Sequence, residues 1–228
     1  CAAAPRSLAS TPSSTRRAIG ACFIRFFMIL ENFQSITADL KKQIMHSDVL
    51  LSDCILDQNV KKSFIFNDPT FFPFYYYLGK YTKAENLLVL GAESGFTTSC
   101  FLKSNRAKKV VCFQEGDDEF YSVRGCYANI AKQQPNTTIF CGDLFNEDIL
   151  REITSQKWDC ILVNLDLNYD KLRNYLDVAW ENLVLDGVMV IESELSQHTS
   201  RATQDFLKII QRDYVVFDTR YKVIVVTK

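Results

Sequence analysis

The stretch Asn86-Leu87-Leu88-Val89-Leu90-Gly91-Ala92-Glu93-Ser94-Gly95 decides the fold of this chain. Its apolar run, 86–90, ends abruptly in Gly91, and Gly95 follows four residues later. A short apolar run bounded by a glycine predicts a buried strand. Glycines directly after it favour a tight turn that adopts positive φ and lets a ligand approach the backbone closely. The next segment, 97–105, is predicted to be a helix whose first N–H groups could receive a carboxylate or a phosphate.

The same alternation of apolar runs and helices continues to the end of the chain. Continuous apolar strands separated by helices predict a parallel sheet that is covered on both faces. The last two strands are joined by a turn that is too short for a parallel crossover, so they must pair antiparallel. The predicted fold class is α/β: a Rossmann-like, mostly parallel seven-stranded sheet with an antiparallel C-terminal hairpin and helices on both faces. The strands expected after the first are 109–113, 137–141, 158–163, 187–191, 214–217 and 222–226, and the later helices are 117–133, 147–154, 169–183 and 201–211.

Acidic residues stand at the ends of the second and third predicted strands, where open α/β sheets bind ligands. Glu115 follows Gly91 by 24 residues, and a carboxylate about 20 residues after the glycine turn can accept both ribose hydroxyls. Asp143 can accept a hydrogen bond from an exocyclic amine such as that of adenine. Each acid alone could equally be a solvated residue after a strand. Glu93 occupies the middle-glycine place of the dinucleotide pattern, and its carboxylate would repel a pyrophosphate.

With these residues in place, the segment 86–228 resembles the class I S-adenosylmethionine-dependent methyltransferases. The local pattern LGAESGFTT is similar to the small-molecule O-methyltransferase branch, including catechol-type enzymes. The resemblance implies that the glycine turn binds the methionine part of S-adenosylmethionine, the acid after the second strand binds the ribose, and the acid after the third contacts adenine. The family often has an acid where this chain has Val89. The cofactor-binding residues expected are Gly91, Ala92, Glu93, Gly95, Glu115, Gly116, Asp143, Leu144 and Asn164.

The resemblance also directs attention to the end of the fourth strand. Relatives that methylate amino groups carry Asn or Asp there, followed by Pro-Pro and an aromatic residue, whereas this chain continues Leu165-Asp166-Leu167. The expected acceptor atom is therefore oxygen. A methyltransferase mainly positions its acceptor and sometimes removes its proton. Candidates for that catalytic role are Asn164, Asp166 and His198, although a histidine at a helix start can equally be a solvent-facing or capping residue.

Catechol-type relatives place divalent-metal ligands after the fourth and fifth strands. The matching positions here are Asn164, Glu192 and Ser193, which supply one carboxylate where those relatives have two. Hard cations require several oxygen ligands, so we expect no metal. Glu192 and Glu194 can also be explained as polar residues of a loop after a buried strand.

The expected function is transfer of a methyl group from S-adenosylmethionine to a small-molecule acceptor. A non-catalytic methyltransferase-like scaffold or binding module is the alternative. A nucleic-acid methyltransferase is a third hypothesis, but the formal net charge of −1 argues against a large basic footprint. Such an enzyme would need a basic stripe beside the strand ends, and the sequence offers only scattered basic residues for it: Lys103, Arg106, Lys108 and Lys109. The sequence leaves a homodimer open.

The N-terminal part differs in composition from the rest. Residues 1–27 contain four arginines and no acid, a composition that is also typical of a transit segment. We favour a disordered leader or an artefact that adds nothing to the fold, and a transit segment is the alternative. The apolar run 18–30 contains Arg25 and is too short to span a bilayer. Residues 28–85 are expected to form a helical and aromatic cap in which Asp68 or Thr70 begins a short helix, and 86–228 the cofactor-binding domain.

The eight cysteines show no Cys-x-x-Cys spacing, and the chain has only two histidines. A structural zinc site needs four clustered ligands, so none is expected. Cys112, Cys141 and Cys160 lie inside predicted strands and are expected to act as small core residues. Reduced cysteines indicate a reducing compartment, so we expect a cytoplasmic protein, or an organellar one if residues 1–27 are a transit segment.

Overall fold

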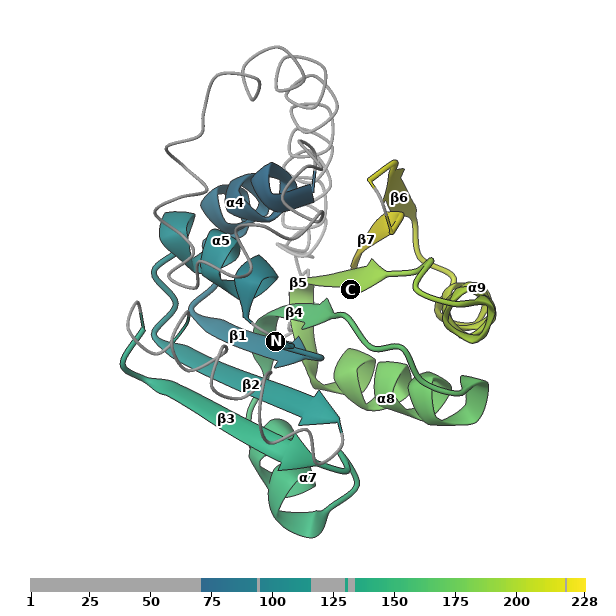
Figure 1. Ribbon diagram of the computed structural model, residues 1–228, viewed down its shortest axis with the longest axis horizontal. Helices are drawn as coiled ribbons and strands as arrows, with labels where there is room; N and C mark the ends of the chain where they lie inside the picture. The colour runs from purple at the N-terminus through teal and green to yellow at the C-terminus, as the bar shows by residue number, and fades with distance from the viewer. Residues whose placement is uncertain (1–70, 94, 116–129, 131–133, 220) are drawn as a thin grey trace, which may run out of the picture.

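The computed structural model describes residues 71–228, except 94, 116–129, 131–133 and 220 (Figure 1). The predictions for residues 1–70, for the helix 117–133 and for Gly116 lie outside the described residues. The helices within the described part are α4 (Phe71–Thr82), α5 (Phe96–Ser104), α7 (Glu147–Thr154), α8 (Tyr169–Asn182) and α9 (Gln197–Ile210). The strands are β1 (Asn86–Leu90), β2 (Lys109–Glu115), β3 (Thr137–Gly142), β4 (Trp158–Val163), β5 (Leu183–Glu192), β6 (Tyr214–Phe217) and β7 (Val223–Thr227).

These strands form one sheet in the order β3-β2-β1-β4-β5-β7-β6. The five strands from β3 to β5 are all parallel to their neighbours. β7 pairs antiparallel with both β5 and β6. The predicted fold class is confirmed, including the antiparallel C-terminal hairpin. None of the described helices is long and apolar enough to cross a membrane.

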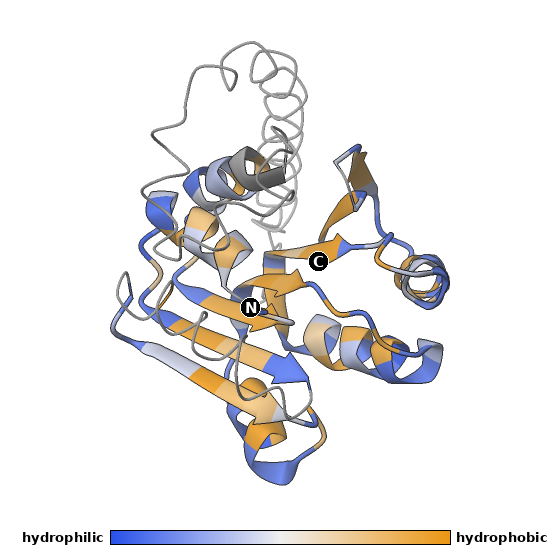
Figure 2. Cartoon of the chain, in the orientation of Figure 1, coloured by the Kyte–Doolittle hydropathy of each residue, from blue (hydrophilic) through white to orange (hydrophobic). Residues whose placement is uncertain are grey.

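Helices cover both faces of the sheet: α4 and α5 lie on one face, and α7, α8 and α9 on the other (Figure 1). Because successive side chains of a strand point to opposite faces, β1 divides its apolar residues between two cores. Leu87 and Val89 pack with α4 and α5, whereas Leu88 and Leu90 pack with α7 and α8. Burial of each such side chain stabilises the fold by roughly 1.5–3 kcal/mol. Figure 2 shows the apolar strands at the centre and polar residues on the outer helix surfaces.

Two elements begin four residues earlier than predicted, whereas the other boundaries within the described part differ by at most two residues. β5 begins at Leu183 rather than Gly187, because Leu183 already pairs with Trp158 before the register shifts. α9 begins at Gln197 rather than Arg201, since the Ser196 hydroxyl accepts a hydrogen bond from the Thr199 N–H at 3.2 Å and caps the helix. A hydroxyl cap of this kind starts a helix without apolar periodicity in its first turn.

The cysteines in the strands differ in burial, because their strands occupy different positions in the sheet. Cys112 and Cys160 are fully buried in the central strands β2 and β4, as predicted. Cys141 is exposed, which corrects its predicted core role. The reason is topological: β3 is the edge strand of the sheet, so its side chains are covered less completely.

The aromatic segment before β1 forms the predicted short helix, α4. Phe74 and Tyr75 are buried, and the ring of Phe74 lies 5.0 Å from that of Phe217 between centroids. Phe74 and Tyr75 therefore belong to the core on the α4 side of the sheet. Tyr75 also carries a hydroxyl into that core, where it needs a hydrogen-bond partner.

Candidate functional site

The topological switch point of the sheet lies between β1 and β4, because the chain runs outward through β2 and β3 before it returns to β4. Gly91 follows β1 there with φ 83°, and its N–H donates to the Phe113 carbonyl at 2.8 Å. A Cβ atom at Gly91 would lie 1.6 Å from the Asn164 carbonyl oxygen. Both the positive φ and this contact require glycine. Ala92, next in the turn, is buried and also donates its N–H to Phe113.

The turn continues into α5 with two more residues at positive φ. Glu93 has φ 45°, and its N–H donates to the Gln114 Oε1 at 2.7 Å. Gly95 has φ 77° and stands at the N-cap of α5, where no side chain caps the helix. A helix start without a side-chain cap favours binding of an anion. The Glu93 carboxyl keeps contact with solvent but is enclosed by protein on most sides, and this dehydration raises its pKa.

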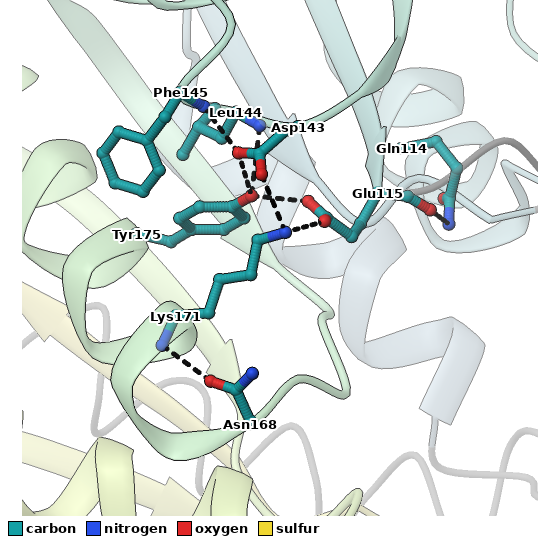
Figure 3. A network of polar contacts seen from close by, with 8 residues as sticks. All are labelled: Gln114, Glu115, Asp143, Leu144, Phe145, Asn168, Lys171 and Tyr175. Atoms are coloured by element: carbon teal, nitrogen blue, oxygen red, sulfur yellow. Dashed lines mark hydrogen bonds and ion pairs between the residues drawn. The ribbon is translucent and has the colours of Figure 1, made fainter.

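Glu115 is the last residue of β2 and Asp143 follows β3, and two side chains of α8 bind both acids (Figure 3). The Lys171 ammonium forms ion pairs with Glu115 and, at 3.0 Å, with Asp143. The Tyr175 hydroxyl contacts the second oxygen of Glu115 and lies 3.2 Å from Asp143. It also accepts the Leu144 N–H at 3.1 Å. The carboxylates expected to hold a nucleoside are thus already in contact with donors from α8.

The charges of this cluster support each other. The hydrogen bond to Glu115 raises the pKa of Lys171. The Phe145 N–H and then Lys171 lower the pKa of Asp143. Burial and the contact with Glu115 raise the pKa of Tyr175. Near neutral pH Lys171 is therefore an ammonium, Asp143 a carboxylate and Tyr175 a neutral phenol.

A second polar group lies on the opposite face of the sheet, beside α4. Glu192 ends β5 and is 1% exposed. Its Oε1 accepts a hydrogen bond of 2.5 Å from the Tyr75 hydroxyl. Its Oε2 is buried without a partner among the described residues, and so is the Oδ1 of Asn164 at the neighbouring end of β4. Burial, with a smaller contribution from the Glu93 carboxyl, raises the pKa of Glu192 to about 8, although the hydrogen bond from Tyr75 lowers it.

The other catalytic candidates lie apart from this group. Asp166 is exposed and accepts a hydrogen bond of 3.2 Å from the Thr199 hydroxyl, which fastens the segment after β4 to the start of α9. His198 is exposed in the first turn of α9. The Ser193 hydroxyl donates to the Lys222 carbonyl oxygen at 2.8 Å.

Four contributors to the site were not predicted from the sequence: Gln114, Lys171, Tyr175 and Tyr75. Lys171 and Tyr175 are four residues apart on α8, a spacing that places both on one face of a helix. That spacing was the available signal, but nothing in the sequence specified which face of α8 points toward β2. For Tyr75, 117 residues separate it from its partner Glu192.

Several solved structures resemble this fold. An O-methyltransferase from Bacillus cereus, in complex with SAH, aligns with a TM-score of 0.59 and 16% identity over 87% of this chain and 99% of its own. The O-methyltransferase TomG from Streptomyces achromogenes, in complex with SAM, aligns with a TM-score of 0.58 and 12% identity over 86% of this chain and 97% of its own. The SAH-bound methyltransferase PaMTH1 from Podospora anserina aligns with a TM-score of 0.55 and 13% identity over 98% of this chain and 99% of its own.

This chain has the class I methyltransferase fold. The likeness is structural, because no family model and no curated protein matches the sequence. In this methyltransferase fold, the Gly91–Gly95 turn, Glu115 and Asp143 follow β1, β2 and β3 in the order anticipated from the sequence.

Proposed function

We propose that this chain is an S-adenosylmethionine-dependent methyltransferase that methylates an oxygen atom of a small-molecule acceptor. The observation that carries the proposal is the convergence of three strand ends: the Gly91–Gly95 turn, Glu115 and Asp143. Each was expected from its place in the sequence, and each stands at the carboxyl edge of the sheet. The same fold occurs in O-methyltransferases crystallised with SAM or SAH.

The residues at these strand ends fit the proposed cofactor. Gly91 keeps the turn free of side-chain atoms, and the start of α5 has no side-chain cap to compete with the methionine carboxylate. Glu115 would accept the ribose hydroxyls, and Asp143, which is half-exposed, would accept the adenine amine. Gly116 remains part of this proposed set, as do Ala92, Glu93 and Leu144. The cofactor, when bound, supplies an electrophilic methyl group on a sulfonium.

Asn164 is the strongest candidate for positioning the acceptor. It ends β4 at the switch point, and its buried Oδ1 has no partner among the described residues, so it can accept a hydrogen bond from an acceptor hydroxyl. Asp166 and His198 are exposed beside the start of α9. They would act only on an acceptor that extends to that side.

The three positions that match the metal ligands of catechol-type relatives offer few ligands to a divalent cation, because only Glu192 Oε2 and Asn164 Oδ1 lack partners among the described residues. One Glu192 oxygen is bonded to Tyr75, and Ser193 is bonded to a backbone carbonyl. Within the described residues no group of three or more His, Cys, Asp or Glu side chains gathers. The proposed reaction therefore relies on the chain's own polar side chains at β4 and β5.

A non-catalytic scaffold is the alternative, and one observation favours it. Lys171 and Tyr175 contact both oxygens of Glu115, so ribose hydroxyls must compete with contacts already made. The nucleic-acid alternative has less support: Lys108 and Lys109 lie at the amino end of β2, opposite the glycine turn, and each pairs with a glutamate. A homodimer and a cytoplasmic location remain parts of the proposal.

Isothermal titration calorimetry with S-adenosylmethionine tests the proposal. Micromolar affinity, together with label transfer from methyl-labelled cofactor to a panel of phenolic and aliphatic hydroxyl compounds, would support an enzyme. No heat of binding at millimolar cofactor would favour the scaffold.

A further inference from the structure

The carboxyl of Glu192 is buried but only half satisfied. The Tyr75 hydroxyl binds one oxygen at 2.5 Å, and the other oxygen has no partner in the described part of the chain. A carboxylate has about four acceptor positions, and leaving buried acceptors unsatisfied is costly. The buried carboxyl of Glu192 can therefore accept a further hydrogen bond or pair with a positive charge.

Asn164 presents a second unsatisfied acceptor to the same region. Val163 pairs with Ile191 in the β4–β5 register, so Asn164 and Glu192 are neighbours at the next step. Leu162 and Val190, two residues earlier on each strand, both face the α4 side of the sheet. Side chains two residues apart on a strand share a face, so Asn164 and Glu192 also face that side. Two neighbouring acceptors that have no donor within the described part of the chain suit a ligand that donates hydrogen bonds or carries positive charge.

Glu93 adds a second carboxyl. It stands in the turn that packs against the end of β4, where a Cβ atom at Gly91 would lie 1.6 Å from the Asn164 carbonyl oxygen. Its negative charge raises the pKa of both Glu192 and Tyr75. Among the described residues, neither Glu93 nor Glu192 forms an ion pair with a lysine, arginine or histidine. By contrast, Lys171 compensates the carboxylates at the nucleoside end. The carboxyl groups without a basic partner are thus on the side of the glycine turn near β4 and β5, and because their pKa values are raised, a bound positive charge would favour their ionised forms.

We propose that Glu93 and Glu192, with Asn164, recognise the positive charge at the methyl-donating end of the cofactor, so that the site binds the sulfonium more tightly than its neutral thioether product. This inference rests on the function proposed above. Methyl transfer breaks the S–CH₃ bond, leaves its electron pair on sulfur and forms the O–CH₃ bond, while the acceptor proton passes to solvent or a base. The sulfur then carries no charge, and the two carboxyls lose the partner that held them together. Product release is favoured as a result.

The test is a calorimetric comparison of three ligands in buffer with EDTA, which prevents a divalent cation from supplying the charge. The ligands are S-adenosylmethionine, its amine analogue sinefungin, which replaces the sulfonium by a protonated amine, and the neutral product S-adenosylhomocysteine. We expect Glu192→Gln and Glu93→Gln each to weaken binding of the two cationic ligands by about tenfold or more, and binding of the neutral product by less than about threefold. Glu194→Gln is the matched control: it lies two residues beyond Glu192 but is exposed and paired with Lys222.

The remaining outcomes overturn the inference. Equal weakening of all three ligands would place the carboxyls at the ammonium group that all three share, or in a purely structural role. Unchanged binding of the cationic ligands would show that neither carboxyl senses their charge. If Glu192→Gln does not fold, as thermal unfolding would reveal, Glu93→Gln alone decides, since the Glu93 side chain keeps contact with solvent. Failure of all three ligands to bind the unmodified chain would instead remove the proposed function, and this inference with it.

Discussion

Replacing Lys171 with methionine should lower the stability of the fold and raise its affinity for the cofactor. Methionine retains most of the side-chain length and removes the ammonium that lies between Glu115 and Asp143. Two carboxylates would then face each other without a cation, which destabilises the native state. At the same time one oxygen of Glu115 would become available to a ribose hydroxyl. The two effects have opposite signs, so they can be separated experimentally.

The exposed fractions of the side chains set the size of the stability effect. Lys171 and Glu115 are 28% and 17% exposed, and Asp143 is 54% exposed. Fully exposed ion pairs contribute about 0–1 kcal/mol, whereas removing one partner of a fully buried pair costs about 3–5 kcal/mol. This partly buried cluster lies between these limits, and we expect a loss of about 1–2 kcal/mol. For a chain of this size that corresponds to a fall in Tm of roughly 3–6 °C.

The affinity effect follows from the contact that the ligand no longer has to displace. If opening the Lys171–Glu115 pair costs about 1 kcal/mol on binding, its removal strengthens binding about fivefold. Urea unfolding measures the first quantity. Calorimetry with adenosine and with S-adenosylmethionine measures the second, and adenosine reports on the nucleoside end alone. Lys208→Met is the control, because Lys208 forms an exposed pair with Asp205 on α9, away from the glycine turn. Weaker binding by a stably folded Lys171→Met variant would refute the reasoning, since Lys171 would then belong to the ligand's own contacts.

Three further predictions address the rest of the site. Glu115→Ala should weaken cofactor binding tenfold to hundredfold, because a charge-assisted hydrogen bond contributes about 1.5–3 kcal/mol; unchanged calorimetric affinity would reject its assignment to the ribose. Gly91→Ala should destabilise the fold by about 3 kcal/mol or more or prevent folding, because its Cβ would lie 1.6 Å from the Asn164 carbonyl oxygen; a near-normal Tm would contradict this. Burial raises the pKa of Glu192 to about 8, above the unfolded value of about 4.3, so the native state holds the extra proton between these values and stability falls as pH rises from 5 to 8. Urea titrations should show a shallower fall for Glu192→Gln, and parallel curves would argue against the shift.

Much of the fold and half of the site follow from local sequence. The strands β1, β2 and β4 are short apolar runs, and the parallel arrangement then brings Gly91, Glu115 and Asp143 to one edge of the sheet without further information. The start of α9 was missed because Ser196 begins it with a hydroxyl cap and not with an apolar residue. The start of β5 was missed because the Asp186–Gly187 pair resembles a turn, although the strand continues through it.

The partners of the acids could not be predicted, because they depend on how separate elements dock. Lys171 contacts Glu115 only because α8 packs against the sheet with one particular face. The apolar residues Leu172 and Leu176, which are buried in the core, determine that face. Tyr75 reaches Glu192 only through the packing of α4. Periodicity identifies the buried stripe of a helix, but the polar residues at the margin of that stripe are positioned by the contacts of the whole core.

The contrast between the two ends of the site bears on whether the chain is an enzyme or a scaffold. At the end proposed to bind the nucleoside, Lys171 and Tyr175 contact both acids, so these acids have partners without a ligand. At the β4–β5 end Glu192 is buried with one oxygen unsatisfied and with Glu93 nearby. A buried acceptor without a partner costs about 1–3 kcal/mol, and a glutamine or an apolar residue at position 192 would avoid the charge repulsion. In a scaffold this arrangement would only lower the stability of the fold. In a site that binds a cation and then releases a neutral product, the same carboxyl would also favour the charged ligand. The stability of Glu192→Gln relative to the unmodified chain therefore discriminates between the hypotheses: a more stable variant that has lost its preference for the sulfonium identifies a residue retained for binding rather than for folding.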